Sequence, residues 1–201
     1  AGYDVVVQDI DPYTMAQAMG TIEAGLGRQA KSRRISEADA SAALARIHGS
    51  SDLAEMAGCD LIIESAPEDE EIKRQIFEDL KSVLKPHALI ATNTSSISIT
   101  RLATASDRPG KFIGVHFMNP VTAMALVEVI PGVATEQATT DAVAEVIERL
   151  GKTSVMAQDF PGFMVNRILA PMLNEAIYAL HEGVGTVDAI DSALVLGAHH
   201  P

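Results

Sequence analysis

A histidine and a glutamate lie on two consecutive apolar segments of the chain. His116 falls within residues 112–117, and Glu128 lies inside the apolar run of residues 126–130. A carboxylate in the middle of an apolar strand is costly to bury unless it is paired. An imidazole can accept the proton of an alcohol near neutral pH, and an adjacent carboxylate fixes its tautomer and stabilises the imidazolium. If the two segments are neighbouring strands, the pair predicts general acid–base catalysis; the alternative is an isolated structural histidine.

A second group of polar residues follows another apolar run. Asn93 and Ser95 belong to the sequence Thr-Asn-Thr-Ser-Ser at residues 92–96, directly after the apolar residues 88–91. Doubly wound sheets bind their ligands outside the carboxyl ends of the strands, where this segment is expected to lie. Its hydroxyl and amide groups could bind a cofactor or a substrate oxygen. The same residue types could also do no more than cap a helix.

An acid ends the first hydrophobic run of the chain. The residues Val5, Val6 and Val7 are followed by Gln8 and then by Asp9. In dinucleotide-binding folds, an acid at the end of the second strand hydrogen-bonds the adenosine ribose hydroxyls. Such a carboxylate would repel a 2′-phosphate, so it favours NAD over NADP. The chain contains no GxGxxG sequence, and the alternative is a strand-to-helix turn with a capping acid.

The charge of the chain is strongly acidic, with a local exception. The formal net charge is -12, from 27 acidic and 15 basic residues. This balance disfavours nucleic acid or an anionic membrane as a partner, because both are bound by neutralising phosphates. A basic cluster could hold a small anionic ligand, or could be a solvated helix end. The cluster consists of Arg28, Lys31, Arg33 and Arg34.

These residues are carried by β-rich segments that alternate with helical ones. Helices are predicted to begin at Asp11-Pro12 and at Ser36, and to cover residues 70–84 and 135–150. The alternation predicts βαβ crossovers and a parallel sheet whose strands are buried on both faces. The strand candidates are residues 4–9, 60–64, 88–93, 112–117, 126–130 and 153–157.

The pattern changes near residues 159–162. Residues 163–181 form one long helical pattern, and residues 187–196 begin another. We therefore expect an α/β domain over residues 1–160 and the start of an all-helical domain over residues 161–201. Because the sequence does not open with Met, we expect a fragment of a larger protein, and the helical domain is left unfinished at residue 201.

Cysteine content and hydropathy indicate the compartment. Cys59 is the only cysteine, which excludes an internal disulfide and is typical of a reducing compartment. No apolar run approaches the roughly 20 residues that a membrane span needs. We expect a cytoplasmic protein with no membrane partner. No His, Cys or carboxylate spacing predicts a metal site, since His199 and His200 are adjacent and face apart.

Four segments resemble the 3-hydroxyacyl-CoA dehydrogenase family, including its bacterial 3-hydroxybutyryl-CoA members. The resemblance covers nearly the whole chain, and the last two motifs, in this order and spacing, are specific. The segments are Ile-Glu-Ser-Ala-Pro-Glu at 63–68, Asn-Thr-Ser-Ser at 93–96, His-Phe-Met-Asn-Pro at 116–120 with Glu128 following, and Asp-Phe-Pro-Gly-Phe-Met-Val-Asn-Arg at 159–167.

This resemblance implies a fold, a reaction and partners. The fold would be a Rossmann-like doubly wound sheet followed by a helical domain that forms a homodimer. Compared with the family, we expect this chain to be truncated at both ends, with the first βα unit and its glycine-rich turn missing. The reaction would be the reversible NAD-dependent oxidation of a (3S)-3-hydroxyacyl-CoA to a 3-oxoacyl-CoA, in fatty acid or hydroxybutyryl-CoA metabolism. An acyl-CoA would be the substrate and NAD the cofactor, which supplies the hydride chemistry while the protein supplies orientation and the proton.

The resemblance also implies residue roles. His116 would be the general base in oxidation and the acid in reduction, with Glu128 as its orienting partner. Ser95 and Asn166 would bind the reacting oxygen and neighbouring groups of the substrate. The remaining expected contacts are Asn119 as a support of the substrate site, Lys31 on the CoA phosphates, and Asp9, Glu68, Lys73 and Asn93 on NAD.

Two other functions are weighed against this one. Another β-hydroxyacid or sugar-nucleotide dehydrogenase would generally use a lysine or cysteine in the helical region, where this chain has Asn166. A non-catalytic relative with a dinucleotide fold would fit the missing glycine-rich turn. The presence of His116, Glu128, Ser95 and Asn166 together argues against that second alternative.

Overall fold

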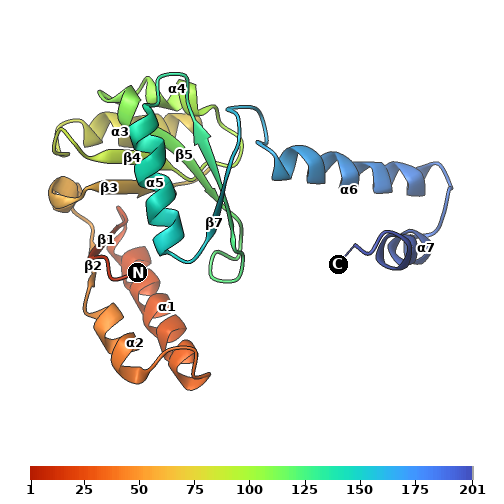
Figure 1. The fold of residues 1–201 in the computed structure, drawn as a ribbon, viewed down its shortest axis with the longest axis horizontal. Helices are drawn as coiled ribbons and strands as arrows, with labels where there is room; N and C mark the ends of the chain where they lie inside the picture. Colours follow the sequence, from red (N-terminus) through yellow and green to blue (C-terminus); the bar gives the residue numbers. More distant parts are fainter. Residues whose placement is uncertain (201) are drawn as a thin grey trace.

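The computed structural model describes residues 1–200, which form two β-sheets and a C-terminal helical arm (Figure 1). Three short turns complete the elements: 3-10 turns at Leu53–Gly58 and Pro109–Lys111 and a π-helical turn at Ala193–Gly197. In chain order the helices and strands are β1 (Val5–Gln8), α1 (Pro12–Lys31), α2 (Glu37–Leu44), β2 (Ile47–Ser50), β3 (Leu61–Glu64), α3 (Glu70–Leu80), β4 (Leu89–Thr92), α4 (Ile99–Ala103), β5 (Phe112–Phe117), β6 (Leu126–Pro131), α5 (Gln137–Arg149), β7 (Thr153–Met156), α6 (Val165–His181) and α7 (Val187–Ser192).

The main sheet has five strands in the order β3-β4-β5-β6-β7. Strands β3, β4 and β5 are parallel, as are β6 and β7. The expected parallel sheet is found with one exception, because β6 runs antiparallel to β5. The loop of residues 118–125 joins these strands without a helix. It is shorter than the roughly dozen residues that a parallel crossover needs.

A second sheet consists of β1 and β2 alone. These strands are parallel, with Val5 opposite Ile47 and Gln8 opposite Ser50, and they are joined by α1 and α2. Strand β2 was not predicted, because it contains only one large apolar residue. Figure 1 shows α1 and α2 as a hairpin that extends from this small sheet.

The helix starts follow local capping. Asp11 accepts hydrogen bonds from the backbone N–H groups of Tyr13 and Thr14, with proline at the first helical position. Ser36 and Asp39 form a reciprocal capping box at the start of α2. Both starts were predicted. The helix α3 ends at Leu80, earlier than the helical pattern to residue 84 suggested.

The core lies on both faces of the main sheet. On one face, the rings of Phe77 in α3 and Phe112 in β5 meet edge to face, with centroids 4.8 Å apart. On the other face, α5 packs Val143 and Ile147 against alternate residues of the strands. Burial on both faces explains the nearly continuous apolar strands, and it confirms the expected α/β class.

The helical arm begins where the sheet ends. In Figure 1, α6 projects away from the sheet, and α7 lies below the far end of α6. None of the residues of α6 is buried, and Ile168 and Ile177 are 69% and 65% exposed. Along residues 1–200, no helix combines the length and apolar character needed to cross a bilayer.

Candidate active site

His116 and Glu128 face each other across the antiparallel pair β5–β6. They occupy directly opposed positions in the strand register. The Nδ1 atom of His116 lies 2.7 Å from Oε2 of Glu128. The side chain of Glu128 is completely buried, and that of His116 is 7% exposed. The predicted proximity of the two residues is therefore found, and the antiparallel turn between the strands produces it.

The other ring nitrogen of His116 points to Ser95. Its Nε2 atom lies 3.1 Å from Oγ of Ser95, in the loop that follows β4. An ionised carboxylate only accepts hydrogen bonds, so we assign the ring hydrogen to Nδ1, where it is donated to Glu128. Nε2 then carries a lone pair and accepts a hydrogen bond from the Ser95 hydroxyl. This arrangement leaves Nε2 able to accept a proton.

Glu128 also caps the N-terminus of α6. Its Oε1 atom accepts hydrogen bonds from the backbone N–H groups of Met164 and Val165, at 2.9 and 3.0 Å. These donors belong to the first turn of the helix, where N–H groups lack intrahelical partners and a negative charge is stabilised. Each oxygen of the buried carboxylate thus has its own partners. The contact of Glu128 with His116 was predicted from the sequence, and this second contact was not.

The carboxylate of Glu68 holds the loop that carries Ser95. Its Oε1 atom accepts from the Thr94 hydroxyl at 2.7 Å, from the Ser95 N–H at 2.9 Å, and from the N–H and hydroxyl of Ser96 at 3.0 and 2.9 Å. Burial acts to raise the pKa of Glu68, but these hydrogen bonds and the charge of Lys73 outweigh it and lower the pKa. The ionised form is therefore the one that orders the loop.

Lys73 is buried and contacts residues at the end of β3 and directly after it. Only 1% of its side chain is exposed, and Nζ contacts Oε1 of Glu64 at 2.8 Å and the carbonyl oxygen of Ala66 at 3.0 Å. The Oε2 atom of Glu68 lies 3.7 Å away. Glu64 also accepts from the Thr92 hydroxyl at 2.6 Å. The structure thus gives Lys73 partners inside the protein, and its contact with NAD stays a prediction.

The three predicted asparagines differ in their contacts. Asn93 joins two strand ends, since Oδ1 accepts from the Phe117 N–H at 2.9 Å and Nδ2 donates to Ser65 at 3.3 Å. Asn119 is exposed after β5, and Asn166 is half-buried in the first turn of α6. Within residues 1–200, the structure records no side-chain hydrogen bond of Asn119 or Asn166. Their amide groups are therefore able to bind a ligand.

Asp9 lies at the carboxyl end of β1, in the smaller sheet. Its Oδ1 atom accepts a hydrogen bond from the N–H of Asp11 at 2.9 Å. Within residues 1–200, no protein group is recorded on its other oxygen. A half-buried carboxylate with one oxygen open fits the recognition of a ribose diol.

Asp159 was treated only as part of a motif in the sequence, and the structure gives it a clear structural contact. Its carboxylate accepts from the Ser98 hydroxyl at 2.9 Å and from the N–H groups of Ile99 and Thr100 at 2.9 and 2.8 Å. Burial acts to raise its pKa, but the hydrogen bonds from Thr100, Ile99 and Ser98 outweigh it and lower the pKa. Asp159 thereby fastens the segment before α6 to the start of α4.

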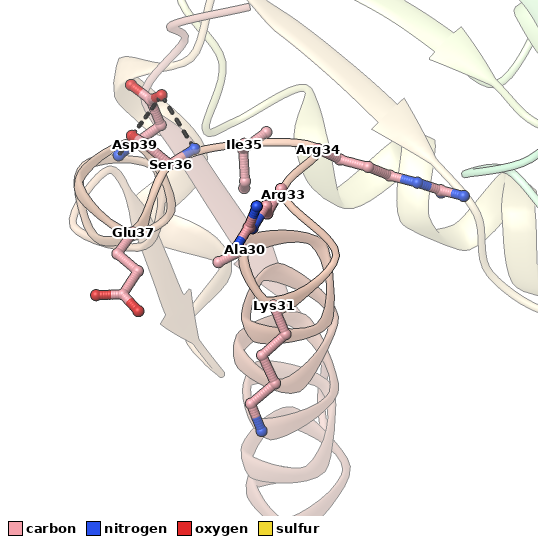
Figure 2. A pocket seen from close by; sticks show the side chains of 8 residues that line it. All are labelled: Ala30, Lys31, Arg33, Arg34, Ile35, Ser36, Glu37 and Asp39. Atoms are coloured by element: carbon pink, nitrogen blue, oxygen red, sulfur yellow. Dashed lines mark hydrogen bonds between the residues drawn. The ribbon is translucent and has the colours of Figure 1, made fainter.

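Three members of the basic cluster, Lys31, Arg33 and Arg34, line an open hollow of about 660 Å³ between the end of α1 and the start of α2 (Figure 2). In Figure 2, Lys31 points along α1, whereas Arg34 extends in another direction from the connecting loop. Ser36 and Asp39 are hydrogen-bonded to each other at the start of α2, on one side of the hollow. The cations therefore do not converge on one point, and the contact of Lys31 with CoA stays a prediction.

Comparison with known proteins gives matches along the whole chain. Residues 1–160 match the family model described as 3-hydroxyacyl-CoA dehydrogenase, NAD binding domain, and residues 162–201 match the C-terminal domain of the same family. The chain is 54% identical to a 3-hydroxybutyryl-CoA dehydrogenase of Bradyrhizobium diazoefficiens, over 100% of this chain and 69% of that protein. It is 48% identical to a probable 3-hydroxybutyryl-CoA dehydrogenase of Deinococcus radiodurans, over 100% of this chain and 72% of that protein.

A solved structure agrees with these sequence matches. The crystal structure of (S)-3-hydroxybutyryl-CoA dehydrogenase PaaH1 from Ralstonia eutropha superimposes with a TM-score of 0.96 at 41% sequence identity. The superposition covers 98% of this chain and 70% of that one. The likeness therefore extends over both the sheet and the helical arm.

Proposed function

Because this chain belongs to the 3-hydroxyacyl-CoA dehydrogenase family, we propose that it interconverts a (3S)-3-hydroxyacyl-CoA and a 3-oxoacyl-CoA through His116. Members of this family are NAD-dependent oxidoreductases, and the expected fold class, enzyme class and cofactor are confirmed. The observation that carries the proposed mechanism is the hydrogen-bonded chain from Glu128 through His116 to Ser95.

Proton transfer takes place at Nε2 of His116. In oxidation, the C3 hydroxyl gives its proton to Nε2 as the carbonyl bond forms at C3. NAD, when bound, supplies the acceptor for the hydride that leaves C3. The imidazolium that results is stabilised by the carboxylate of Glu128, which lies 2.7 Å from Nδ1. In reduction the same imidazolium returns the proton to the C3 oxygen.

Ser95 positions the reacting oxygen. While Nε2 is unprotonated, the Ser95 hydroxyl donates to it; once Nε2 carries the proton, Ser95 Oγ can accept and its own O–H becomes free. That O–H can then donate to the C3 oxygen of the substrate. Glu68 fixes the backbone N–H groups of Ser95 and Ser96, which keeps the hydroxyl within reach of His116.

The residues present fit the two ends of NAD. The open oxygen of Asp9 would accept from the adenosine ribose hydroxyls, and a 2′-phosphate would be repelled there. Glu68 and Asn93, which follow β3 and β4, would contact the nicotinamide half. The amides of Asn119 and Asn166 would bind the acyl-CoA near the reacting carbon, and Lys31 would contact the CoA phosphates.

The proposal extends to substrate size and metabolic role. The relatives from Bradyrhizobium and Deinococcus carry the name 3-hydroxybutyryl-CoA dehydrogenase, which supports a four-carbon acyl group. The role would lie in fatty acid β-oxidation or hydroxybutyryl-CoA metabolism. A single, half-buried cysteine supports a reducing, cytoplasmic location.

The division of the chain and its assembly belong to the same proposal. We place the NAD-binding domain at residues 1–160 and the helical domain at residues 161–201. The exposed apolar side chains of α6 support a homodimer in which this helix packs against a second copy. They include Ile168, Leu173, Ile177 and Tyr178. Sedimentation equilibrium of the full-length protein would test the dimer.

The test of function is the oxidation of NADH by acetoacetyl-CoA, followed by loss of NADH absorbance with the full-length protein. Robust turnover with NADH and little with NADPH is expected, which would support both the reaction and the role of Asp9. The His116→Gln variant serves as the control for the chemical step. A folded protein that binds NADH and shows no turnover with any 3-oxoacyl-CoA would overturn the proposal.

A further inference from the structure

The backbone takes an unusual path between β7 and α6. Gly162 and Phe163 are consecutive residues with positive φ angles, +78° and +49°. Glycine adopts this left-handed conformation readily, but for a bulky residue such as phenylalanine it is uncommon and strained. A Cβ atom at position 162 would lie 3.1 Å from the backbone nitrogen of Arg167. The turn is therefore both conformationally and sterically specific.

Surrounding contacts hold this turn in place. The N–H of Phe163 donates to the carbonyl oxygen of Phe160 at 2.9 Å, and the N–H of Arg167 donates to that of Gly162 at 3.0 Å. On the side before the turn, Asp159 is fastened to α4. Strained residues persist where the surroundings over-determine them, and such residues cluster at functional sites.

The turn delivers two groups to the proton-transfer pair. It directs the N–H groups of Met164 and Val165 at Oε1 of Glu128. It also places the ring of Phe163, which is 4% exposed, beside that of His116 with 5.6 Å between centroids. Glu128 is completely buried, so without these donors one of its oxygens would lack a partner. The carboxylate would then be free to rotate away from His116.

We propose that the Gly162–Phe163 turn is a positioning element for proton transfer. It orients the start of α6 so that the N–H groups of Met164 and Val165 donate to Glu128. The helix N-terminus holds Glu128 in one orientation, and Glu128 in turn holds His116 with its hydrogen on Nδ1. The position of the start of α6 and the tautomer of His116 are therefore coupled. The kinetic part of this inference rests on the proposed dehydrogenase function; the coupling itself does not.

The chain provides a matched pair of substitutions to test this coupling. Gly183, at the other end of α6, also has a positive φ of +76°, and a Cβ atom there would meet nothing within 4 Å. Gly162→Ala and Gly183→Ala therefore impose the same chemical change on the same type of backbone. Only the first lies next to the donors that contact Glu128.

The main readout is the tautomer of His116 in the full-length protein, without substrate or NADH. Ring nitrogen–proton correlation spectra report it through the carbon-bound hydrogens. We expect the wild type and Gly183→Ala to show one Nδ1–H tautomer, and Gly162→Ala to show a mixture. Steady-state kinetics with acetoacetyl-CoA and NADH provide the second readout. The kcat of Gly162→Ala should fall about tenfold to a hundredfold, while the KM for NADH stays near the wild-type value. The pH dependence of kcat should change only in this variant.

Two results would overturn the inference. One is a folded Gly162→Ala protein with a single Nδ1–H tautomer; the other is an equal loss of the tautomer in both variants. If Gly162→Ala fails to fold, Glu128→Gln tests the same contact from the opposite side. The amide resonances of Met164 and Val165 should then move more than others in α6, and unmoved resonances would refute the coupling. If the wild type shows the single Nδ1–H tautomer of His116 but no turnover of acetoacetyl-CoA, the result would count against the proposed dehydrogenase function and not against the coupling.

Discussion

The site around His116 and the basic hairpin of α1 and α2 both contain charged groups, yet they are built differently. His116 contacts Glu128 on the next strand and Ser95 in the loop after β4. Glu128 in turn accepts from two N–H groups at the start of α6. In the hairpin, the hydrogen bonds of Ser36 and Asp39 join residues three positions apart. Lys31 and Arg34 point in different directions into solvent.

This difference concerns which interactions fix a side chain. A buried carboxylate with partners on both oxygens has one low-energy orientation, because each lost partner leaves an unsatisfied group. An exposed cation keeps its water and loses little when its neighbours change. Substitutions around His116 should therefore alter the reaction strongly, and substitutions in the hairpin should alter it weakly.

The largest effect is expected for His116→Gln. Glutamine cannot take up the proton at the position of Nε2, so kcat should fall about 10²- to 10⁴-fold, the contribution typical of general acid–base catalysis. Stopped-flow and steady-state assays with acetoacetyl-CoA would measure the loss. Binding of NADH, followed by fluorescence titration, should stay close to that of the wild type. Unchanged turnover in this variant would remove His116 from the mechanism.

A smaller effect is expected for Ser95→Ala. The variant loses the hydroxyl that contacts Nε2 but keeps the N–H that donates to Glu68, so the loop should stay in place. A fall in kcat of about tenfold to a hundredfold follows if the hydroxyl positions the reacting oxygen. Ser96→Ala is the matched control, because its hydroxyl contacts Glu68 and not His116. Equal losses in the two variants would mean that the loop, rather than the hydroxyl of Ser95, is what matters.

Much of this site could be predicted because it depends on strands with clear apolar patterns. The strands β5 and β6 were placed within a residue, and their adjacency made the pairing of His116 with Glu128 an expected contact. The missed strand β2 is different, since its Ile-His-Gly-Ser sequence has no apolar alternation. It is defined by pairing with β1 and by Met15 and Met19, which pack over Gly49.

The unpredicted polar contacts share one property. Asp159 lies about 60 positions from the groups that it binds, and Thr92 lies 28 positions from Glu64. Local spacing carries no information about such pairs, whereas helix caps such as Asp11 are encoded within three residues. Glu64 and Thr92 also face each other on adjacent strands, but α3 separates those strands in the chain. His116 and Glu128 could be paired because their strands are consecutive and joined by a short loop.

Asp159→Asn should affect stability rather than proton transfer. Asparagine keeps one acceptor but turns an NH₂ group toward N–H donors, and the loss should be about 1–2 kcal/mol after allowance for partial exposure. The lowered pKa of Asp159 sets the pH dependence of this effect. A carboxylate with a lowered folded pKa stabilises fully above the unfolded pKa of about 3.9, and this stabilisation is lost as pH falls through the folded pKa.

The measurement for Asp159→Asn is therefore the difference in Tm from the wild type across pH. The difference should be constant from neutral pH down to about pH 4 and should shrink below it. Because other carboxylates titrate in both proteins, the difference isolates Asp159. A Tm difference that grows toward acid pH would contradict the assigned hydrogen bonds, and a difference that stays constant below pH 4 would mean that the carboxylate charge is not involved.

The smallest effect is expected in the basic hairpin, and it bears most directly on the comparison between the two regions. An exposed ion pair contributes about 0.2–1 kcal/mol, so Lys31→Ala should raise the KM for acyl-CoA by no more than about fivefold and leave kcat unchanged. Added salt should remove the difference, because exposed charges are screened over about 10 Å at 0.1 M ionic strength. Arg34→Ala is the control, since this side chain extends away from Lys31 in the same hollow.

A rise in KM for Lys31→Ala alone would identify a specific phosphate contact, and an equal rise in both would indicate only the positive field of the hairpin. A loss of kcat in either variant would show instead that the hairpin is coupled to His116, and the contrast between a buried, coupled site and an exposed, independent one would no longer hold.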